Sequence, residues 1–136
     1  MTTYPLDELD AITPPALARL NAAGIRTSRE ILERCARPEG RAQVSETTGI
    51  CCIDLLSWVH RADLLRVAGI GRQTAEILRH AGVDSIRDLR RRNPDRLVAA
   101  VRSVNEVRRL AKTTPSESQV RRWIDAAKVT RALVRY

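Results

Sequence analysis

Frequent turn-forming residues constrain the fold of this chain more than any other feature of its sequence. Gly and Pro leave segments of about 8–14 residues between them, and apolar side chains recur within these segments at spacings of three and four. That spacing is typical of short amphipathic helices. Strand-like alternation is scarce, and residues 132–136 show it best. The sequence therefore predicts an all-α protein of about eight to ten short helices.

Residues at the ends of these segments support the prediction. Thr13-Pro14 and Asn93-Pro94 each place a good N-cap residue before a Pro at the first helical position. Gly24 and Gly82 are expected to end helices. Thr114-Pro115-Ser116-Glu117 is interpreted as a capping box that begins another helix.

Two parts of the sequence resemble each other, which predicts an internal repeat. Residues 12–25 align with residues 70–83 at an offset of 58, and Trp58 matches Trp123 at an offset of 65. We therefore expect two copies of one helical unit, each closed by a helix whose Trp lies in the core, packed together as one compact body. The alternative is a chance match between two similar helical segments.

The two predicted units, residues 1–62 and 63–136, differ in charge. The chain has a net charge of +8. Residues 1–60 hold six Arg against eight acidic residues, whereas residues 61–136 hold 18 basic against eight acidic residues. A basic half points to a polyanionic partner. Because 22 of the 24 basic residues are Arg, a genome that favours Arg codons explains the charge equally well.

The segment 64–78 carries the most specific motif. Gly69-Ile70-Gly71 predicts a tight turn whose middle side chain points inward, and Arg72, Gln73 and Thr74 begin the next helix. Two glycines allow the backbone to turn sharply and to approach a ligand closely. The free N–H groups and the dipole at the start of the helix favour a phosphate there, and Arg72 and Gln73 add side-chain donors.

This pattern resembles the helix-hairpin-helix motif, and residues 81–89 resemble its usual continuation into a second helix pair. The resemblance implies contacts with DNA phosphates, which carry no sequence information. Two alternatives stay open: the turn serves packing alone, or the hairpin contacts another protein.

The corresponding turn of the first copy departs from the pattern. Ala11-Ile12-Thr13 replaces the Gly-Ile-Gly turn, and Pro14-Pro15 replaces Arg72-Gln73. The two prolines remove two N–H donors where a phosphate would bind. We expect this copy to keep its hydrophobic frame, which includes Leu17 and Leu20, and to have lost the phosphate site.

Arginines crowd the region after the hairpin, and Arg90, Arg91 and Arg92 are candidates for further phosphate contacts. If they share a face with residues 69–74, they form a groove for a sugar-phosphate backbone, and binding depends steeply on salt. A solvated surface paired with acids is an equally good interpretation of these three residues. We favour the solvated surface for the later basic residues, which are Arg102, Arg108, Arg109, Lys112, Arg121, Arg122 and Lys128.

Over nearly its full length, the sequence resembles a bacterial family of unknown function built from two tandem helix-hairpin-helix units. The features are residues 9–32, a Trp-x-x-x-Ala-Asp-Leu stretch at residues 58–64 that leads into the hairpin, the Arg92-Asn93-Pro94 turn, and residues 115–127 around Trp123. The resemblance implies this fold and a nucleic-acid role.

Metal and redox chemistry find little support. Cys51, Cys52 and His60 lack metal-ligand spacing, and the chain has only two His, so we expect no metal. Cys51 and Cys52 are interpreted as buried thiols in an amphipathic helix. Three cysteines without regular spacing fit a reducing compartment.

Enzyme, cofactor and membrane roles are not expected either. No Ser-His-Asp set or nucleotide-binding loop is found, which predicts no catalysis and no cofactor. No apolar run approaches the roughly 18 residues of a membrane helix, and residues 1–8 do not resemble a secretory signal. We therefore expect a cytoplasmic protein with no membrane partner.

The sequence thus predicts a non-enzymatic protein that binds nucleic acid without sequence preference, with duplex DNA as the expected form. The hairpin at residues 69–74 and the basic C-terminal half would make the contacts. The alternative function is a protein–protein interaction or scaffold module in which the hairpin is structural only.

Overall fold

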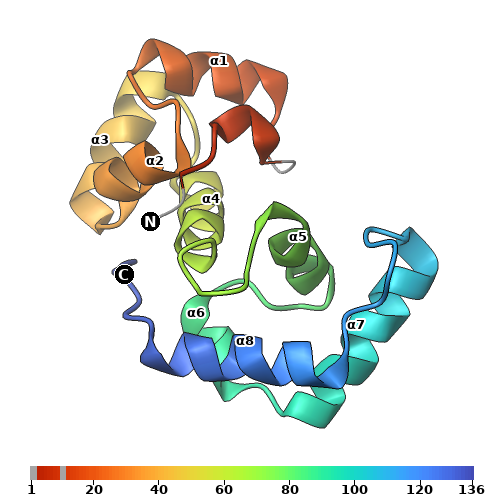
Figure 1. The fold of residues 1–136 in the computed structure, drawn as a ribbon. Helices are drawn as coiled ribbons and strands as arrows, with labels where there is room; N and C mark the ends of the chain where they lie inside the picture. The colour runs from red at the N-terminus through yellow and green to blue at the C-terminus, as the bar shows by residue number, and fades with distance from the viewer. Residues whose placement is uncertain (1–2, 10–11) are drawn as a thin grey trace. The chain divides into compact units, whose positions relative to one another are not determined.

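The computed structural model describes residues 3–9 and 12–136, and these residues form short helices joined by tight turns (Figure 1). The predicted all-α class is confirmed: the described residues contain eight α-helices and no strand, and residues 131–136 lack regular structure. The helices are η1 (Leu6–Glu8), α1 (Pro14–Ala22), α2 (Ser28–Cys35), α3 (Pro38–Thr48), α4 (Cys52–Leu64), α5 (Arg72–His80), α6 (Ile86–Arg91), α7 (Pro94–Arg108) and α8 (Glu117–Val129).

The chain divides into two compact units. The first unit is Met1–Asp63 with Leu133–Tyr136, and the second unit is Leu64–Ala132. The last four residues belong to the first unit because the Arg135 amide donates a hydrogen bond to the Ala36 carbonyl at 2.7 Å. The Leu133 amide likewise donates to the Asp63 carboxylate at 3.0 Å.

A buried arginine organises the first unit. Arg41 of α3 is 6% exposed, and its guanidinium donates hydrogen bonds to the carbonyls of Cys35 at 3.0 Å, Ala36 at 3.1 Å and Arg135 at 2.6 Å. A buried charge is tolerated where hydrogen bonds satisfy it. Arg41 therefore fastens both the end of α2 and the C-terminal segment to this unit.

The connections α1–α2 and α5–α6 have the same local geometry. Gly24 and Gly82 follow α1 and α5 with φ of +85° and +89°, values that only Gly adopts without strain. The amide of the next residue then bonds back to the helix, from Ile25 to Leu20 at 2.9 Å and from Val83 to Leu78 at 2.8 Å. The repeat proposed from the sequence requires this likeness.

Side-chain caps begin the later helices, and one of them differs from the prediction. Asn93 caps α7 by accepting a hydrogen bond from the Arg96 amide at 3.1 Å. The capping box of α8 is formed by Ser116 and Gln119, so the prediction of a box at Thr114–Glu117 was wrong. Ser116 lies directly before α8, whereas the Thr114 hydroxyl accepts a hydrogen bond from the Asn105 side-chain amide at 3.1 Å.

The two tryptophans and the three cysteines test the burial predictions. Trp58 on α4 and Trp123 on α8 are 7% and 5% exposed, which confirms that both are core residues. Cys51 and Cys52 are exposed, so the prediction that they are buried was wrong: they precede and begin α4, on its solvent side. Cys35 is the buried thiol, and burial raises its pKa to about 11.

No helix within residues 3–9 and 12–136 combines the length and the apolar character that a membrane span requires.

Candidate nucleic-acid interface

The turn between α4 and α5 is tight and has a buried apex. The Val67 amide donates to the Leu64 carbonyl at 3.0 Å, and the Ile70 amide donates to the Val67 carbonyl at 3.1 Å. Gly69 has a φ of +85°, which a side chain would strain. Ile70 is 4% exposed, so its side chain points inward as predicted and fixes the turn to the core of the second unit.

The start of α5 presents free backbone donors. Gly71 is the N-cap, and since it has no side chain it caps nothing. The first helical hydrogen bond runs from the Ala75 amide to the Gly71 carbonyl at 2.9 Å. The amides of Arg72, Gln73 and Thr74 have no acceptor among the residues that the structure describes. Unsatisfied N–H groups and the helix dipole together favour an anion at this end.

The surroundings of these amides are compatible with an anion. The first turn of α5 contains no acidic residue, and the side chains of Arg72 and Gln73 are exposed. A phosphate at this helix end would meet one exposed guanidinium and no carboxylate from the first turn. Arg72 therefore adds a full charge to the partial charge of the helix end.

The loop between α7 and α8 is held beside the start of α5. The Gln73 side-chain amide donates a hydrogen bond to the Leu110 carbonyl. This loop carries Arg109, with a φ of 49°, and exposed Lys112. Figure 1 shows α7 rising next to α5 within the second unit. Gln73, expected as a phosphate donor, thus also positions a basic loop.

Asn105 gives this loop its shape. It is 6% exposed on α7, its amide nitrogen donates to the Ala111 carbonyl at 3.2 Å, and its oxygen accepts from the Ala111 amide at 2.9 Å. Sequence reasoning missed this residue. The available signal was an Asn near the end of a helix, followed by a basic stretch, residues 108–114, without Gly or Pro.

The three arginines expected to extend the site have different roles. Arg90 is half-buried and donates to the Thr130 carbonyl at 2.9 Å. Arg92 pairs with Asp88 at 3.0 Å and also donates to the Gly82 carbonyl at 2.6 Å, and the hydrogen bond to Asp88 raises the pKa of Arg92. Arg91 is exposed and has no partner in the described part of the chain. Arg91 is therefore the member of the triplet best placed to meet a ligand.

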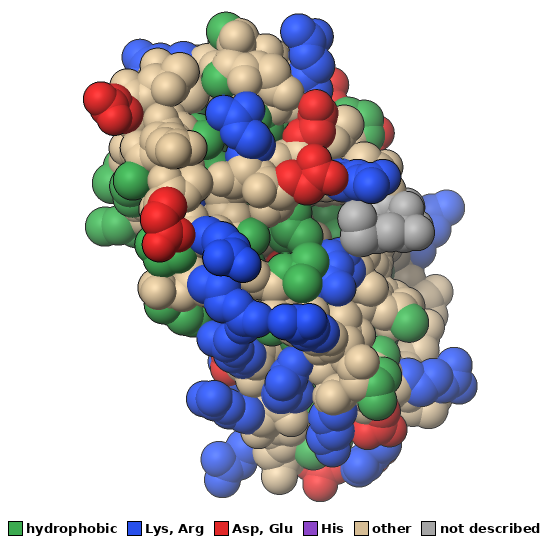
Figure 2. All heavy atoms as spheres, turned by 90° about the vertical axis from the view of Figure 1, so that its left-hand side faces the viewer, with side chains coloured by type: hydrophobic (Ala, Val, Ile, Leu, Met, Phe, Trp, Pro, Cys, Tyr) green, Lys and Arg blue, Asp and Glu red, His purple; other side chains and the backbone are tan. Residues whose placement is uncertain are grey.

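Charge is concentrated in the second unit. The first unit contains eight Arg and nine acidic residues, for a net charge of −1, and the second contains 16 basic and seven acidic residues, for +9. On the face shown in Figure 2, Lys and Arg side chains (blue) gather over the lower part, at the height of α6 and α8 in Figure 1. A polyanion would meet this unit with a favourable long-range field.

The corresponding turn of the first unit offers fewer donors. Ala11, aligned with Gly69, lies outside the described residues. Thr13 precedes α1 without capping it, and Pro14 and Pro15 occupy the first two helical positions. Pro has no N–H, so two of the amides that α5 presents have no counterpart in α1.

Among residues 3–9 and 12–136, no group of three or more His, Cys, Asp or Glu is arranged to hold a metal ion.

The family model described as a domain of unknown function, DUF4332, matches residues 10–130. No curated protein and no solved structure matches the chain.

Proposed function

The chain belongs to the DUF4332 family, and we propose that it binds nucleic acid through the backbone phosphates, without sequence preference and without catalysing a reaction. The turn at residues 64–71 and the start of α5, both in the second unit, make the contacts expected of a helix-hairpin-helix motif, and duplex DNA is the expected partner. The observation that carries the proposal is the set of free amides at Arg72, Gln73 and Thr74, on the unit that holds a net charge of +9.

The physical argument for nucleic acid rests on donors and charge. Backbone N–H groups contact phosphate oxygens equally well in any sequence, so the element grips the duplex and does not read it. Hydrogen bonds to a charged group contribute about 1.5–3 kcal/mol each. Exposed Arg72, Arg91 and Lys112 add positive charges that neutralise phosphates and so release the cations condensed around the duplex.

Fluorescence anisotropy with labelled oligonucleotides tests the proposal. Two unrelated duplexes are expected to bind with similar affinity, and binding should weaken as salt is raised. Single-stranded DNA and RNA of the same length identify the preferred form. Arg72→Glu is expected to weaken duplex binding by about tenfold or more, which corresponds to about 1.4 kcal/mol. Arg37→Glu makes the same charge change at an exposed position of the first unit and serves as the matched control.

The alternative, a protein–protein interaction module, makes a different prediction. In that case the hairpin serves packing alone, and Arg72→Glu and Arg37→Glu have the same small effect on duplex binding. If the protein binds no duplex at low salt but retains one stoichiometric protein partner at any salt concentration, the nucleic-acid proposal is contradicted and the interaction module takes its place.

A further inference from the structure

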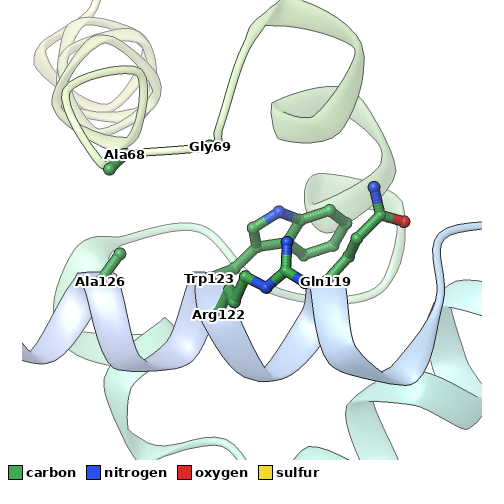
Figure 3. Close-up of a pocket in the computed structure, with 6 residues that line it drawn as sticks. All are labelled: Ala68, Gly69, Gln119, Arg122, Trp123 and Ala126. Atoms are coloured by element: carbon green, nitrogen blue, oxygen red, sulfur yellow. The ribbon is translucent and has the colours of Figure 1, made fainter.

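A pocket of about 320 Å³ lies beside the hairpin, within the second unit. Figure 3 shows how it is built: the turn that leads into α5 forms one side, and successive turns of α8 form the other. The lining residues are Ala68, Gly69, Gln119, Arg122, Trp123 and Ala126. The proposed function does not account for this pocket.

Trp123 directs its indole N–H toward the pocket. The residue is 5% exposed, yet its indole N–H has no acceptor in the part of the chain that the structure describes. The indole nitrogen faces the turn (Figure 3), and a Cβ built on Gly69 would lie 3.7 Å from it. Although the residue is buried, its N–H opens to the pocket, so an acceptor on a ligand in the pocket can reach it.

Gln119 offers the NH₂ group of its side chain to the pocket as a hydrogen-bond donor. Its oxygen is committed to the capping box of α8, where it accepts a hydrogen bond from the Ser116 amide at 2.9 Å. That bond fixes the orientation of the side chain and leaves the NH₂ group available. The neighbouring Arg122 lines the same pocket and forms no ion pair or hydrogen bond with any described residue.

The lining thus combines three kinds of donor with no acidic side chain. The acids nearest in sequence on α8 have partners elsewhere: Glu117 pairs with Arg121 at 2.9 Å, and Asp125 pairs with Lys128 at 3.9 Å. An indole N–H, a carboxamide NH₂ and a guanidinium match the oxygens of an anion. The small apolar side chains of Ala68 and Ala126 leave room for the carbon skeleton attached to it.

We propose that this pocket is a sugar-phosphate subsite, in which Trp123, Gln119 and Arg122 hold one phosphate while Ala68 and Ala126 contact its sugar. The inference rests on the proposed function, because the phosphate would belong to the nucleic acid bound at the hairpin. Gly69 is common to the turn and to the pocket, so the two sites are continuous.

The indole N–H signals of the protein test the subsite directly. The chain has two tryptophans, so ¹⁵N-labelled protein gives two indole signals, and Trp123→Phe assigns them. Inorganic phosphate, titrated at constant ionic strength against chloride, is expected to shift the Trp123 signal in a saturable way. Trp58 is the internal control, because it lies in the near-neutral first unit and the hollow beside it holds the carboxylate of Asp54 together with the single guanidinium of Arg19.

A pair of variants tests the role of the guanidinium. Arg122→Gln is expected to raise the phosphate Kd, measured from the saturation of the Trp123 shift, by roughly fivefold or more. Arg121→Gln removes the same charge from the next position of α8, where the side chain pairs with Glu117 and Asp95 instead. It should leave the titration unchanged.

The outcomes separate the subsite from the proposed function. A Trp123 signal that does not move, or that moves together with Trp58, overturns the subsite. A duplex that binds while Trp123 stays unmoved also overturns the subsite and leaves the hairpin proposal intact. A response to inorganic phosphate without any duplex binding supports the phosphate chemistry of the pocket and overturns its nucleic-acid source.

Discussion

The starts of α1 and α5 sit in closely similar frameworks but present different chemistry. Each helix ends at a left-handed Gly and passes into a helix with a hydroxyl N-cap, Thr27 for α2 and Ser85 for α6. At their starts, α1 has Pro14-Pro15 and α5 has Arg72-Gln73. The frame depends on apolar spacing and caps, whereas the anion site depends on free amides. The helical frame can therefore persist in a unit that has lost the anion site.

The arginines show the same contrast. Arg41 of the first unit is buried and holds three carbonyls, so its charge serves the fold. Arg72 and Arg91 of the second unit are exposed and leave their charges to a ligand. Removing an arginine should therefore cost stability in one unit and affinity in the other. The following predictions test that division, in order of decreasing expected effect.

Arg41→Ala is expected to have the largest effect, a loss of about 3 kcal/mol in the free energy of unfolding. It removes the hydrogen bonds of the guanidinium to the buried Cys35 carbonyl and to the Arg135 carbonyl of the C-terminal segment, as well as one of the two bonds to the Ala36 carbonyl. Urea denaturation measures the loss. Arg29→Ala, which removes an exposed pair with Glu33, should cost about 0.5 kcal/mol or less. Equal costs for the two variants would contradict a structural role for Arg41.

Asn105→Ala should follow, with a loss of about 2 kcal/mol, because it removes the hydrogen bonds that shape the loop before α8. Thermal or urea unfolding measures this loss. Duplex affinity at a temperature where the variant is folded should also fall, since the loop carries Lys112 beside α5. A variant that loses stability but keeps its affinity would exclude the loop from the interface.

Arg72→Pro gives α5 the proline that α1 has at its first helical position, Pro14. It should cost about 1.5 kcal/mol in the free energy of duplex binding, with little change in stability. Proline suits the first position of a helix, and Gly71 before it already has extended backbone. The variant removes one amide donor and one charge, whereas Arg72→Gln removes the charge alone. Anisotropy should rank affinity as wild type, then Arg72→Gln, then Arg72→Pro. Equal binding by the two variants would show that the amide contributes nothing.

Cysteine modification should have the smallest effect. Iodoacetamide at neutral pH is expected to label exposed Cys51 and Cys52, whereas buried Cys35, with its pKa raised to about 11, stays protonated and unreactive until the chain unfolds. Mass spectrometry counts the labels. Doubly labelled protein should bind duplex within about twofold of the unlabelled form, because both thiols lie in the near-neutral unit. A larger loss of duplex affinity would show that the first unit contributes to the interface.

Local features were predictable from the sequence, and contacts between distant residues were not. The helices, the Asn93 cap and the burial of both tryptophans follow from spacing and capping preferences within a few residues. The bond from Arg41 to Arg135 joins residues 94 positions apart, and no local pattern indicates it.

The misplaced capping box shows the limit within a single segment. Thr114–Glu117 and Ser116–Gln119 both fit the capping pattern. In the structure Ser116 caps the helix, and the Thr114 hydroxyl accepts a hydrogen bond from Asn105, nine residues before it. The exposure of Cys51 and Cys52 was missed for a related reason, since only their position at the very start of α4 turns them to solvent.

The backbone amides at the start of α5 allow the most direct test of the central claim. ¹⁵N-labelled protein, titrated with a duplex, should show downfield shifts of the Arg72, Gln73 and Thr74 amide protons that saturate together. The amide of Ala16, the first after the two prolines of α1, should stay in place. Duplex binding that leaves the three α5 amides unmoved would contradict the account.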